Sequence, residues 1–209
     1  MDWTALYLKT SGLNVFILGT GEVATRRANK FLDHGAIVKL AGNSIGEELL
    51  SKGAMLHPTD EVDELVGWAD LVVVASGDKE LSDYVSNISQ NKLVNRADFP
   101  NDGDIIVPTS FNIGDIQISI FTNGKSPLMA RQLRKRIQSI ITEEDILEIE
   151  LQDYSRSLLK KYIPNQKDRR DYLYKIFEDE NIQNLIQSGE IDEAKAVICE
   201  LIMRDFNDT

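Results

Sequence analysis

A glycine-rich turn between an apolar run and an amphipathic stretch restricts the fold of this chain more than any other feature. Residues 14–18 are β-prone and lead into Gly19-Thr20-Gly21, after which apolar residues recur at helical spacing as far as Leu32. The turn matches G-x-G-x-x-G/A: the first glycine permits a tight turn, the second lets the backbone approach a pyrophosphate, and Ala24 lets helix and strand pack closely. The sequence therefore predicts a dinucleotide site that includes Gly19 and Gly21; the alternative is a plain tight turn.

The alternation of apolar runs continues beyond this turn. Gly35 is placed to end the first helix. We expect a strand at residues 36–41, a strand at 71–75, a helix at 81–90 and a strand at 92–95. With right-handed crossovers these elements form an open α/β sheet of Rossmann type, which we assign to residues 1–108.

The pattern changes after residue 108. Isoleucines alternate with polar residues from Ile116 to Ile120, which is typical of a half-exposed strand. Ser126-Pro127 is a favourable helix start, with serine as N-cap and proline at the first helical position. We therefore expect a small α/β segment at residues 109–141 and a helical C-terminal module at residues 142–209.

Composition excludes several classes of function. The net charge of −11 argues against a nucleic-acid-binding protein. No apolar run is long enough to cross a membrane, and the N-terminus lacks the basic start of a secretory signal, so we expect a cytoplasmic protein. The single cysteine, Cys199, excludes an internal disulfide, and with only two histidines, His34 and His57, no metal site is expected.

One stretch departs from this acidic character. Residues 116–141 contain no acidic residue. The same stretch carries five basic residues: Lys125, Arg131, Arg134, Lys135 and Arg136. It is either a local anion site or a solvated basic helix face.

Two further loops are candidates for cofactor binding. The second strand ends without the acidic residue that usually binds the adenosine ribose. Asn43 and Ser44 can bind a ribose instead, and no arginine stands there for a 2′-phosphate, so NAD is favoured over NADP; a loop with a helix cap is the alternative. Ser76 and Gly77 follow a central strand and could line the nicotinamide side, or simply form a turn before the next helix.

Asp98 is the candidate general base. It follows the strand at residues 92–95 and precedes Phe99-Pro100, so its carboxylate projects from the same sheet edge as the proposed cofactor site. The alternative is a turn-forming aspartate before proline.

Taken together, three segments resemble the siroheme-synthase N-terminal family, which includes precorrin-2 dehydrogenases and bifunctional dehydrogenase/ferrochelatases. The segments are GTGEVATRRA at residues 19–28, VNRADFP at residues 94–100, and TNGKSPLMAR at residues 122–131 with Leu133-Arg134 following. The second is similar to the family's VN-x-x-D-x-P pattern and the third to T-x-G-K-S-P-x-x-A-R-x-x-R. Their order and spacing also fit, and the resemblance covers about residues 1 to 140.

The resemblance implies NAD-dependent oxidation of precorrin-2, a polycarboxylate tetrapyrrole, to sirohydrochlorin in siroheme biosynthesis. It implies an acid/base role for Asp98, and a homodimer in which the segment at about residues 116–140 pairs between subunits. It places Glu22, Val23, Asn43 and Ser44 at the NAD and Ser126 at the substrate cleft. Substrate contacts are expected from Asn95, Arg96, Lys125, Ser126, Arg131 and Arg134, because guanidinium groups pair with carboxylates.

The chain departs from the family pattern at two places. The nucleotide loop reads Ala75-Ser76-Gly77-Asp78 where the family usually has A-T-D-D. Arg96 stands beside the candidate base at a position that is often apolar, and it could either bind a substrate carboxylate or lower the pKa of Asp98.

Three other interpretations remain open at the level of sequence. The enzyme could also insert Fe²⁺ as a bifunctional ferrochelatase. A non-catalytic NAD(H)-sensing module would explain the glycine-rich turn but not the segments at residues 95–100 and 125–131. An interaction protein with a degenerate fold would bind no cofactor.

Overall fold

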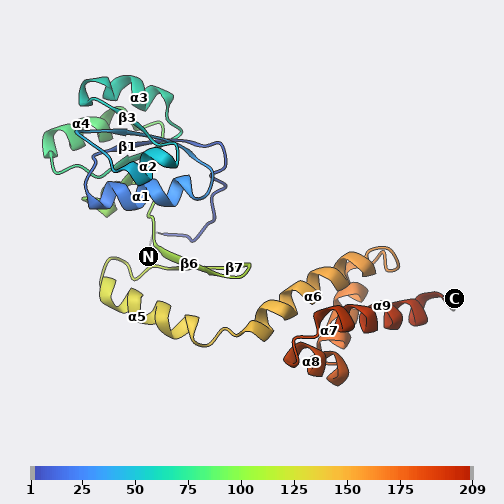
Figure 1. Cartoon of the computed structure of the whole chain (residues 1–209). Coiled ribbons are helices and arrows are strands. Elements are labelled where there is room, and N and C mark those ends of the chain that lie inside the picture. Colours follow the sequence, from blue (N-terminus) through green and yellow to red (C-terminus); the bar gives the residue numbers. More distant parts are fainter. Residues whose placement is uncertain (1–2, 208–209) are drawn as a thin grey trace. The chain divides into compact units, whose positions relative to one another are not determined.

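The computed structural model describes residues 3–207, and the chain divides after Val107 into two compact units. The first unit is built on a five-stranded parallel sheet of order β3-β2-β1-β4-β5 (Figure 1). The strands are β1 (Asn14–Leu18), β2 (Ile37–Ala41), β3 (Met55–His57), β4 (Leu71–Val74) and β5 (Leu93–Arg96). The predicted Rossmann-type sheet is thereby confirmed.

Helices cover both faces of this sheet because its central strands are apolar on both sides. The helices are α1 (Glu22–Leu32), α2 (Glu47–Ser51), α3 (Val62–Trp68) and α4 (Lys79–Ile88), with short 3₁₀ turns at Thr59–Glu61 and Pro100–Asp102. On one face α1 and α2 pack against strand residues such as Ile17 and Val73. On the other face, α3 and α4 pack against strand residues that point the opposite way, such as Phe16 and Val72.

The strand limits differ from the predicted ones by one residue at β2, β4 and β5, and α4 begins earlier than predicted. Helix α4 starts at Lys79 because the side chain of Asp78 accepts a hydrogen bond from the Leu81 N–H, at 3.1 Å, as an N-cap. Elements α2, β3 and α3 were not predicted. Strand β3 has three residues at the sheet edge with Met55 and Leu56 exposed, so it lacks the buried apolar run that identifies a central strand.

The second unit begins with an antiparallel hairpin of β6 (Thr109–Ile113) and β7 (Ile116–Ile120), followed by α5 (Pro127–Gln138). The predicted strand at residues 116–120 and the predicted helix start are both confirmed. The Ser126 hydroxyl accepts a hydrogen bond from the Met129 N–H at 3.1 Å, and Pro127 is the first helical residue.

The remainder of the second unit is helical, as predicted. Its helices are α6 (Glu143–Leu159), α7 (Gln166–Phe177), α8 (Glu180–Gln187) and α9 (Ile191–Asn207). They enclose an apolar core that includes Leu159, Ile182 and Ile198. Thr142 and Asp145 start α6 with a reciprocal capping box.

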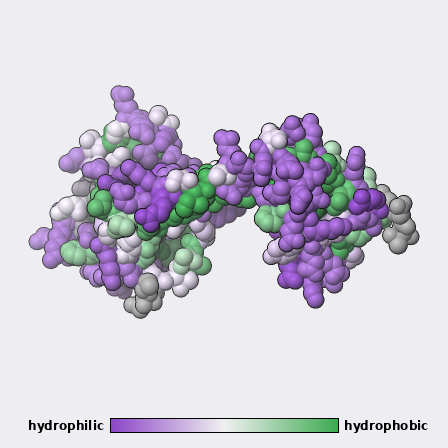
Figure 2. Space-filling view, turned by 90° about the horizontal axis from the view of Figure 1, so that it is seen from below, coloured by the Kyte–Doolittle hydropathy of each residue, from purple (hydrophilic) through white to green (hydrophobic). Residues whose placement is uncertain are grey.

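Hydrophilic side chains predominate on the face drawn in Figure 2. Within residues 3–207, no helix is both long and apolar enough to cross a bilayer.

Candidate functional site

Three strand ends meet at the carboxyl edge of the parallel sheet, where ligands of such folds bind. Gly19 follows β1 with φ +108°, and a Cβ there would lie 2.4 Å from the carbonyl oxygen of Ala75, beyond β4. A Cβ on Gly42, beyond β2, would lie 2.6 Å from Cγ2 of Thr20. The glycine-rich turn is therefore held directly against the loops that follow β2 and β4, and only glycine fits at these positions.

The start of α1 offers free hydrogen-bond donors. Gly21 is the N-cap and supplies no side-chain cap. The first helical bond runs from the Thr25 N–H to the Gly21 carbonyl at 2.9 Å, so the N–H groups of residues 22–24 have no partner within the helix. A Cβ on Gly21 would meet nothing within 4 Å. Open space, free N–H groups and the positive end of the helix dipole fit a dinucleotide pyrophosphate.

The other predicted cofactor residues lie around this turn. Glu22 is exposed and pairs with Arg26 at 3.5 Å, and the Val23 side chain is half-exposed. Asn43 and Ser44 are exposed on the loop after β2, and within the described residues their side chains make no hydrogen bond. Their use as a helix cap is excluded, because the N-cap of α2 is Gly46.

The loop after β4 is partly a capping turn, in line with the alternative of a simple turn before the next helix. The Ser76 hydroxyl accepts a hydrogen bond from the Asp78 N–H at 3.1 Å, and Asp78 caps α4. Gly77 is exposed, and a Cβ on it would meet no atom within 4 Å. The loop therefore leaves space at the sheet edge while its polar side chains are used locally.

Asp98 lies two residues beyond β5 at this same edge, and the neighbouring Ala97 N–H donates to the carbonyl of Val74, the last residue of β4, at 2.9 Å. Its carboxylate accepts a two-pronged ion pair from Arg96: Nε to Oδ1 at 2.8 Å and Nη2 to Oδ2 at 2.7 Å. Burial disfavours the charged carboxylate, but it is outweighed by the hydrogen bonds from Arg96 and from the backbone N–H groups of Phe99 and Asp98. The pKa of Asp98 is consequently below its ordinary value.

Arg96 is almost enclosed, with a side chain only 5% exposed. Its Nη2 also donates to Oδ1 of Asp83 on α4 at 3.1 Å, and the ring of half-exposed Phe99 lies 5.5 Å from its Cζ. The hydrogen bond to Asp98, followed by the one to Asp83, raises the pKa of Arg96. The guanidinium is thus a permanent cation held between two carboxylates.

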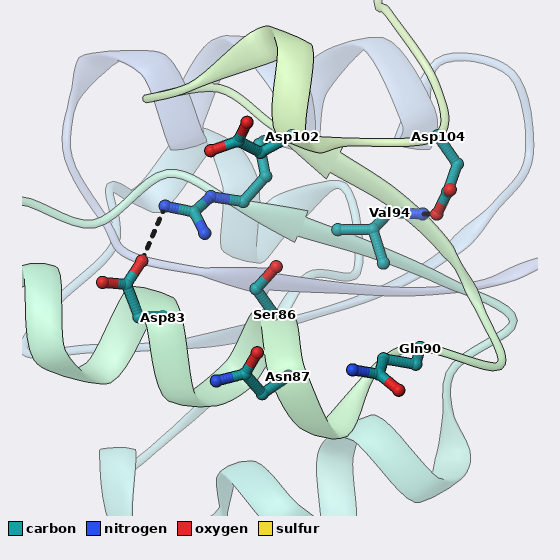
Figure 3. Close-up of a pocket in the computed structure, with 8 residues that line it drawn as sticks. Asp83, Ser86, Asn87, Gln90, Val94, Asp102 and Asp104 are labelled. Carbon is teal, nitrogen blue, oxygen red and sulfur yellow. Dashed lines mark hydrogen bonds and ion pairs between the residues drawn. The ribbon is translucent and has the colours of Figure 1, made fainter.

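Behind this ion pair lies a polar pocket of about 530 Å³ between α4 and the segment that follows β5 (Figure 3). It shares Arg96 with the Asp98 pair, but the glycine-rich turn does not line it. Figure 3 shows Asp83, Ser86 and Asn87 on α4 across from Asp102. Its acidic lining does not suit a dinucleotide, whereas the turn at Gly21 does.

Asn95, predicted to bind substrate, is buried inside the first unit at 2% exposure. Its Nδ2 donates to the Ile105 carbonyl at 2.9 Å, and its Oδ1 has no partner in the described structure. The side chain ties the segment after β5 to the sheet. Gly103 allows the same close approach, since a Cβ there would lie 2.8 Å from the Val94 carbonyl oxygen.

The remaining predicted substrate residues belong to the second unit. Lys125, Arg131 and Arg134 are at least partly exposed, and the Arg134 guanidinium lies 5.2 Å from the ring centroid of Phe111. The Ser126 hydroxyl is used as the α5 cap. The structure thus brings Asp98 and the predicted cofactor residues to one sheet edge in the first unit. In the second unit Arg131 and Arg134 lie on α5, and Lys125 lies two residues before it.

Asp83 was not among the residues predicted for the site. Its carboxylate binds Arg96 across 13 positions of the chain, and no motif marks it. The only signal in the sequence was a carboxylate one turn into the helix before β5. Its partner can be identified only when the packing of α4 is known.

Comparisons with known proteins agree with this geometry. A family model described as "Putative NAD(P)-binding" matches residues 6–109, and one described as "Sirohaem biosynthesis protein central" matches residues 114–140. The chain is 30% identical over 195 residues to a precorrin-2 dehydrogenase of Methanosarcina barkeri, covering 88% of this chain and 86% of the relative. It is 27% identical over 192 residues to a precorrin-2 dehydrogenase of Priestia megaterium, covering 88% and 93% of the two chains.

A solved structure shows the same fold. The precorrin-2 dehydrogenase SirC superposes with a TM-score of 0.74, at 23% identity, over 93% of this chain and 99% of its own. The predicted α/β sheet with a helical C-terminal region is therefore confirmed by a second protein.

Proposed function

This chain belongs to the precorrin-2 dehydrogenase family, and we propose that it oxidises precorrin-2 to sirohydrochlorin with NAD as hydride acceptor. The observation that carries the proposal is the uncapped start of α1 on the same sheet edge as the carboxylate of Asp98. This arrangement supports a cofactor site and a candidate base at one edge of the sheet, as a dehydrogenation that moves a hydride and a proton requires.

The residues of the turn hold the cofactor. Gly19 and Gly21 bring the backbone close to the pyrophosphate, and the free N–H groups of Glu22 and Val23 donate to it. Asn43 and Ser44, with unused polar side chains, bind the adenosine ribose, and Ser76 and Gly77 border the nicotinamide side. The chemistry that NAD would supply when bound is the acceptance of a hydride from the substrate.

Asp98 performs the proton transfer. Because its pKa is lowered, the carboxylate is ionised at neutral pH and can accept a proton from the tetrapyrrole as the conjugated system extends. The proton passes from the carboxylate to solvent, to which the Asp98 side chain is 21% exposed.

The basic stretch of the second unit binds the substrate. Precorrin-2 carries several carboxylates, and Lys125, Arg131 and Arg134 are solvent-accessible cations in a stretch without acidic residues. Arginine binds carboxylates through two parallel hydrogen bonds, so these residues orient the macrocycle as well as attract it.

We also propose that two copies of the chain associate through the hairpin and α5. A two-stranded sheet is marginally stable by itself, and the β6–β7 pair has no third strand within the described residues. Leu128 and Ile140 on and after α5 are 66% and 67% exposed, which is unusual for large apolar side chains. A second copy of the same surface would extend the hairpin and cover these residues.

The test is an anaerobic reaction of purified protein with precorrin-2 and NAD⁺, followed by absorbance. NADH and sirohydrochlorin should appear together. The variant Asp98→Asn, which keeps the size of the side chain, should bind NAD with the wild-type Kd and lose at least about 100-fold in turnover, the usual contribution of a general base. Wild-type turnover in this variant would exclude Asp98 as the base.

A second stage of the same experiment separates the competing functions. Adding Fe²⁺ after sirohydrochlorin has formed reveals a ferrochelatase if siroheme appears faster than in a protein-free control. Tight NAD binding without any NADH formation would instead indicate a sensing module and contradict the dehydrogenase.

A further inference from the structure

The ion pair at Asp98 contains an arginine that the family pattern does not require and a second carboxylate that belongs to another element. Arg96 is the last residue of β5, and Asp98 follows two positions later in the bend after the strand, where its carboxylate meets the guanidinium. Asp83 reaches the same guanidinium from α4. The three residues form one connected group at the edge of the sheet.

We propose that Arg96, anchored by Asp83, is a positioning residue that fixes the orientation and the charge of Asp98, and that it does not bind the substrate. This inference rests on the proposed role of Asp98 as the base. In this proposal Arg96 and Asp83 act on the reaction through Asp98, and neither contacts the macrocycle.

The geometry of the guanidinium supports the assignment. Its Nε and Nη2 donate to the two oxygens of Asp98 at 2.8 and 2.7 Å, and the second Nη2 hydrogen serves Asp83 at 3.1 Å. A planar fork bound through two parallel hydrogen bonds fixes the carboxylate plane, which one point charge would not do. With a side chain 5% exposed, Arg96 has little surface to offer to a substrate carboxylate.

The charged groups around Asp98 show which of them lowers its pKa. From its own segment Asp98 faces Arg96, and from α4 it faces Asp83 through that arginine. The pocket behind the pair is also lined by Asp102 and Asp104. Burial by itself would raise the pKa of Asp98, and Arg96 is the cation whose hydrogen bonds, together with those of the backbone N–H groups, keep that pKa below its ordinary value.

The test measures kcat/KM for NADH formation between about pH 3 and 8, because the acid limb of that profile reports the pKa of the free enzyme's base, and in the wild type the pKa of Asp98 lies below its ordinary value of 3.8. The variants are Arg96→Gln, Arg96→Lys and, as a matched control, Asp102→Asn. Asp102 lines the same pocket, while the ion pairs of the guanidinium go to Asp98 and Asp83, so its loss removes a nearby charge and leaves those pairs intact.

We expect the acid limb to move upwards by at least about one pH unit in Arg96→Gln, since an arginine beside an aspartate lowers its pKa by about 1–3 units. Arg96→Lys keeps a positive charge, so its acid limb should lie close to the wild-type position. Its kcat should stay below the wild-type value because one ammonium group cannot hold the carboxylate plane. The KM for precorrin-2 and the Kd for NAD should remain within about twofold of wild type, and Asp102→Asn should keep the wild-type profile.

Two results would overturn the assignment. A KM for precorrin-2 that rises about tenfold or more in both Arg96 variants, with an unmoved acid limb, would make Arg96 a substrate-binding residue. An unmoved limb with unchanged KM would make it a purely structural one. If Arg96→Gln does not fold, Arg96→Lys gives the same readouts with a smaller shift, and failure of the proposed function is recognised separately by wild-type turnover in Asp98→Asn.

Discussion

The open N-cap of α1 allows a substitution whose effects on stability and on binding have opposite signs. In Gly21→Ser, the new hydroxyl can accept a hydrogen bond from the N–H of residue 23 or 24, which have no partner in the helix now. The backbone of Gly21 permits this, because its φ of −75° and ψ of −177° are ordinary values for an N-cap, and no atom stands within 4 Å of the added Cβ.

The magnitudes follow from these contacts. Serine exceeds glycine as an N-cap by about 0.3 kcal/mol. For a unit of this size that amounts to a rise of about 1–2 °C in the Tm of the ligand-free protein. The same hydroxyl removes a donor from the pyrophosphate, and a hydrogen bond to a charged group contributes about 1.5–3 kcal/mol. The Kd for NAD should therefore rise by roughly tenfold or more.

Two measurements on the same sample check this prediction: thermal melting followed by circular dichroism without cofactor, and calorimetric titration with NAD. Gly19→Ala is the matched control, because its φ of +108° and the 2.4 Å approach to the Ala75 carbonyl oxygen make any side chain strained. Strain of this kind costs about 1–3 kcal/mol, so its Tm should fall by roughly 4 °C or more. An unchanged Kd in Gly21→Ser would refute the pyrophosphate position, and a lowered Tm would refute the cap geometry.

Two further predictions concern the second unit. Asp205 accepts hydrogen bonds from Lys175 and Tyr172, in that order of influence, and they lower its pKa from 3.8 to about 2. Its contribution to stability is therefore complete above about pH 4 and is lost as the pH falls through about 2. Asp205→Asn should lower the Tm at pH 7 and flatten the pH dependence of the Tm between about pH 4 and 2, and an unaltered pH dependence would contradict this role. Leu128→Glu should convert a dimer to a monomer in light scattering while leaving the circular dichroism spectrum unchanged, because the side chain is 66% exposed within one chain; a variant that remains dimeric would place the interface elsewhere.

Several features of the candidate site were predictable because they depend on neighbours in the chain. The turn at Gly19 and Gly21 follows from backbone conformation and helix capping, which involve residues at most a few positions apart. The Ser126 cap followed by proline has the same local origin, and the structure confirms it. The short edge strand β3 escaped prediction because its exposed residues carry no pattern of burial.

The function of individual polar side chains was harder to predict, because a sequence does not show which of them are buried. Asn95 was expected at the substrate, but the bond to the Ile105 carbonyl holds it inside the first unit. For Arg96 the sequence left two roles open, and its enclosure with Asp98 and Asp83 favours the one that acts on the base.

The sequence by itself determined the strand–turn–helix with its glycine-rich cofactor turn, the alternation of the central strands with helices, and the position of Asp98 at a strand end. Each of these depends on short-range conformational preferences and on the periodicity of apolar residues, which are written along the chain. Only the tertiary structure decided that α4 brings Asp83 to Arg96 and that Arg96 is enclosed around Asp98. Such pairings depend on which helix face packs on the sheet, and that choice is made by the whole core rather than by the residues that form the pair.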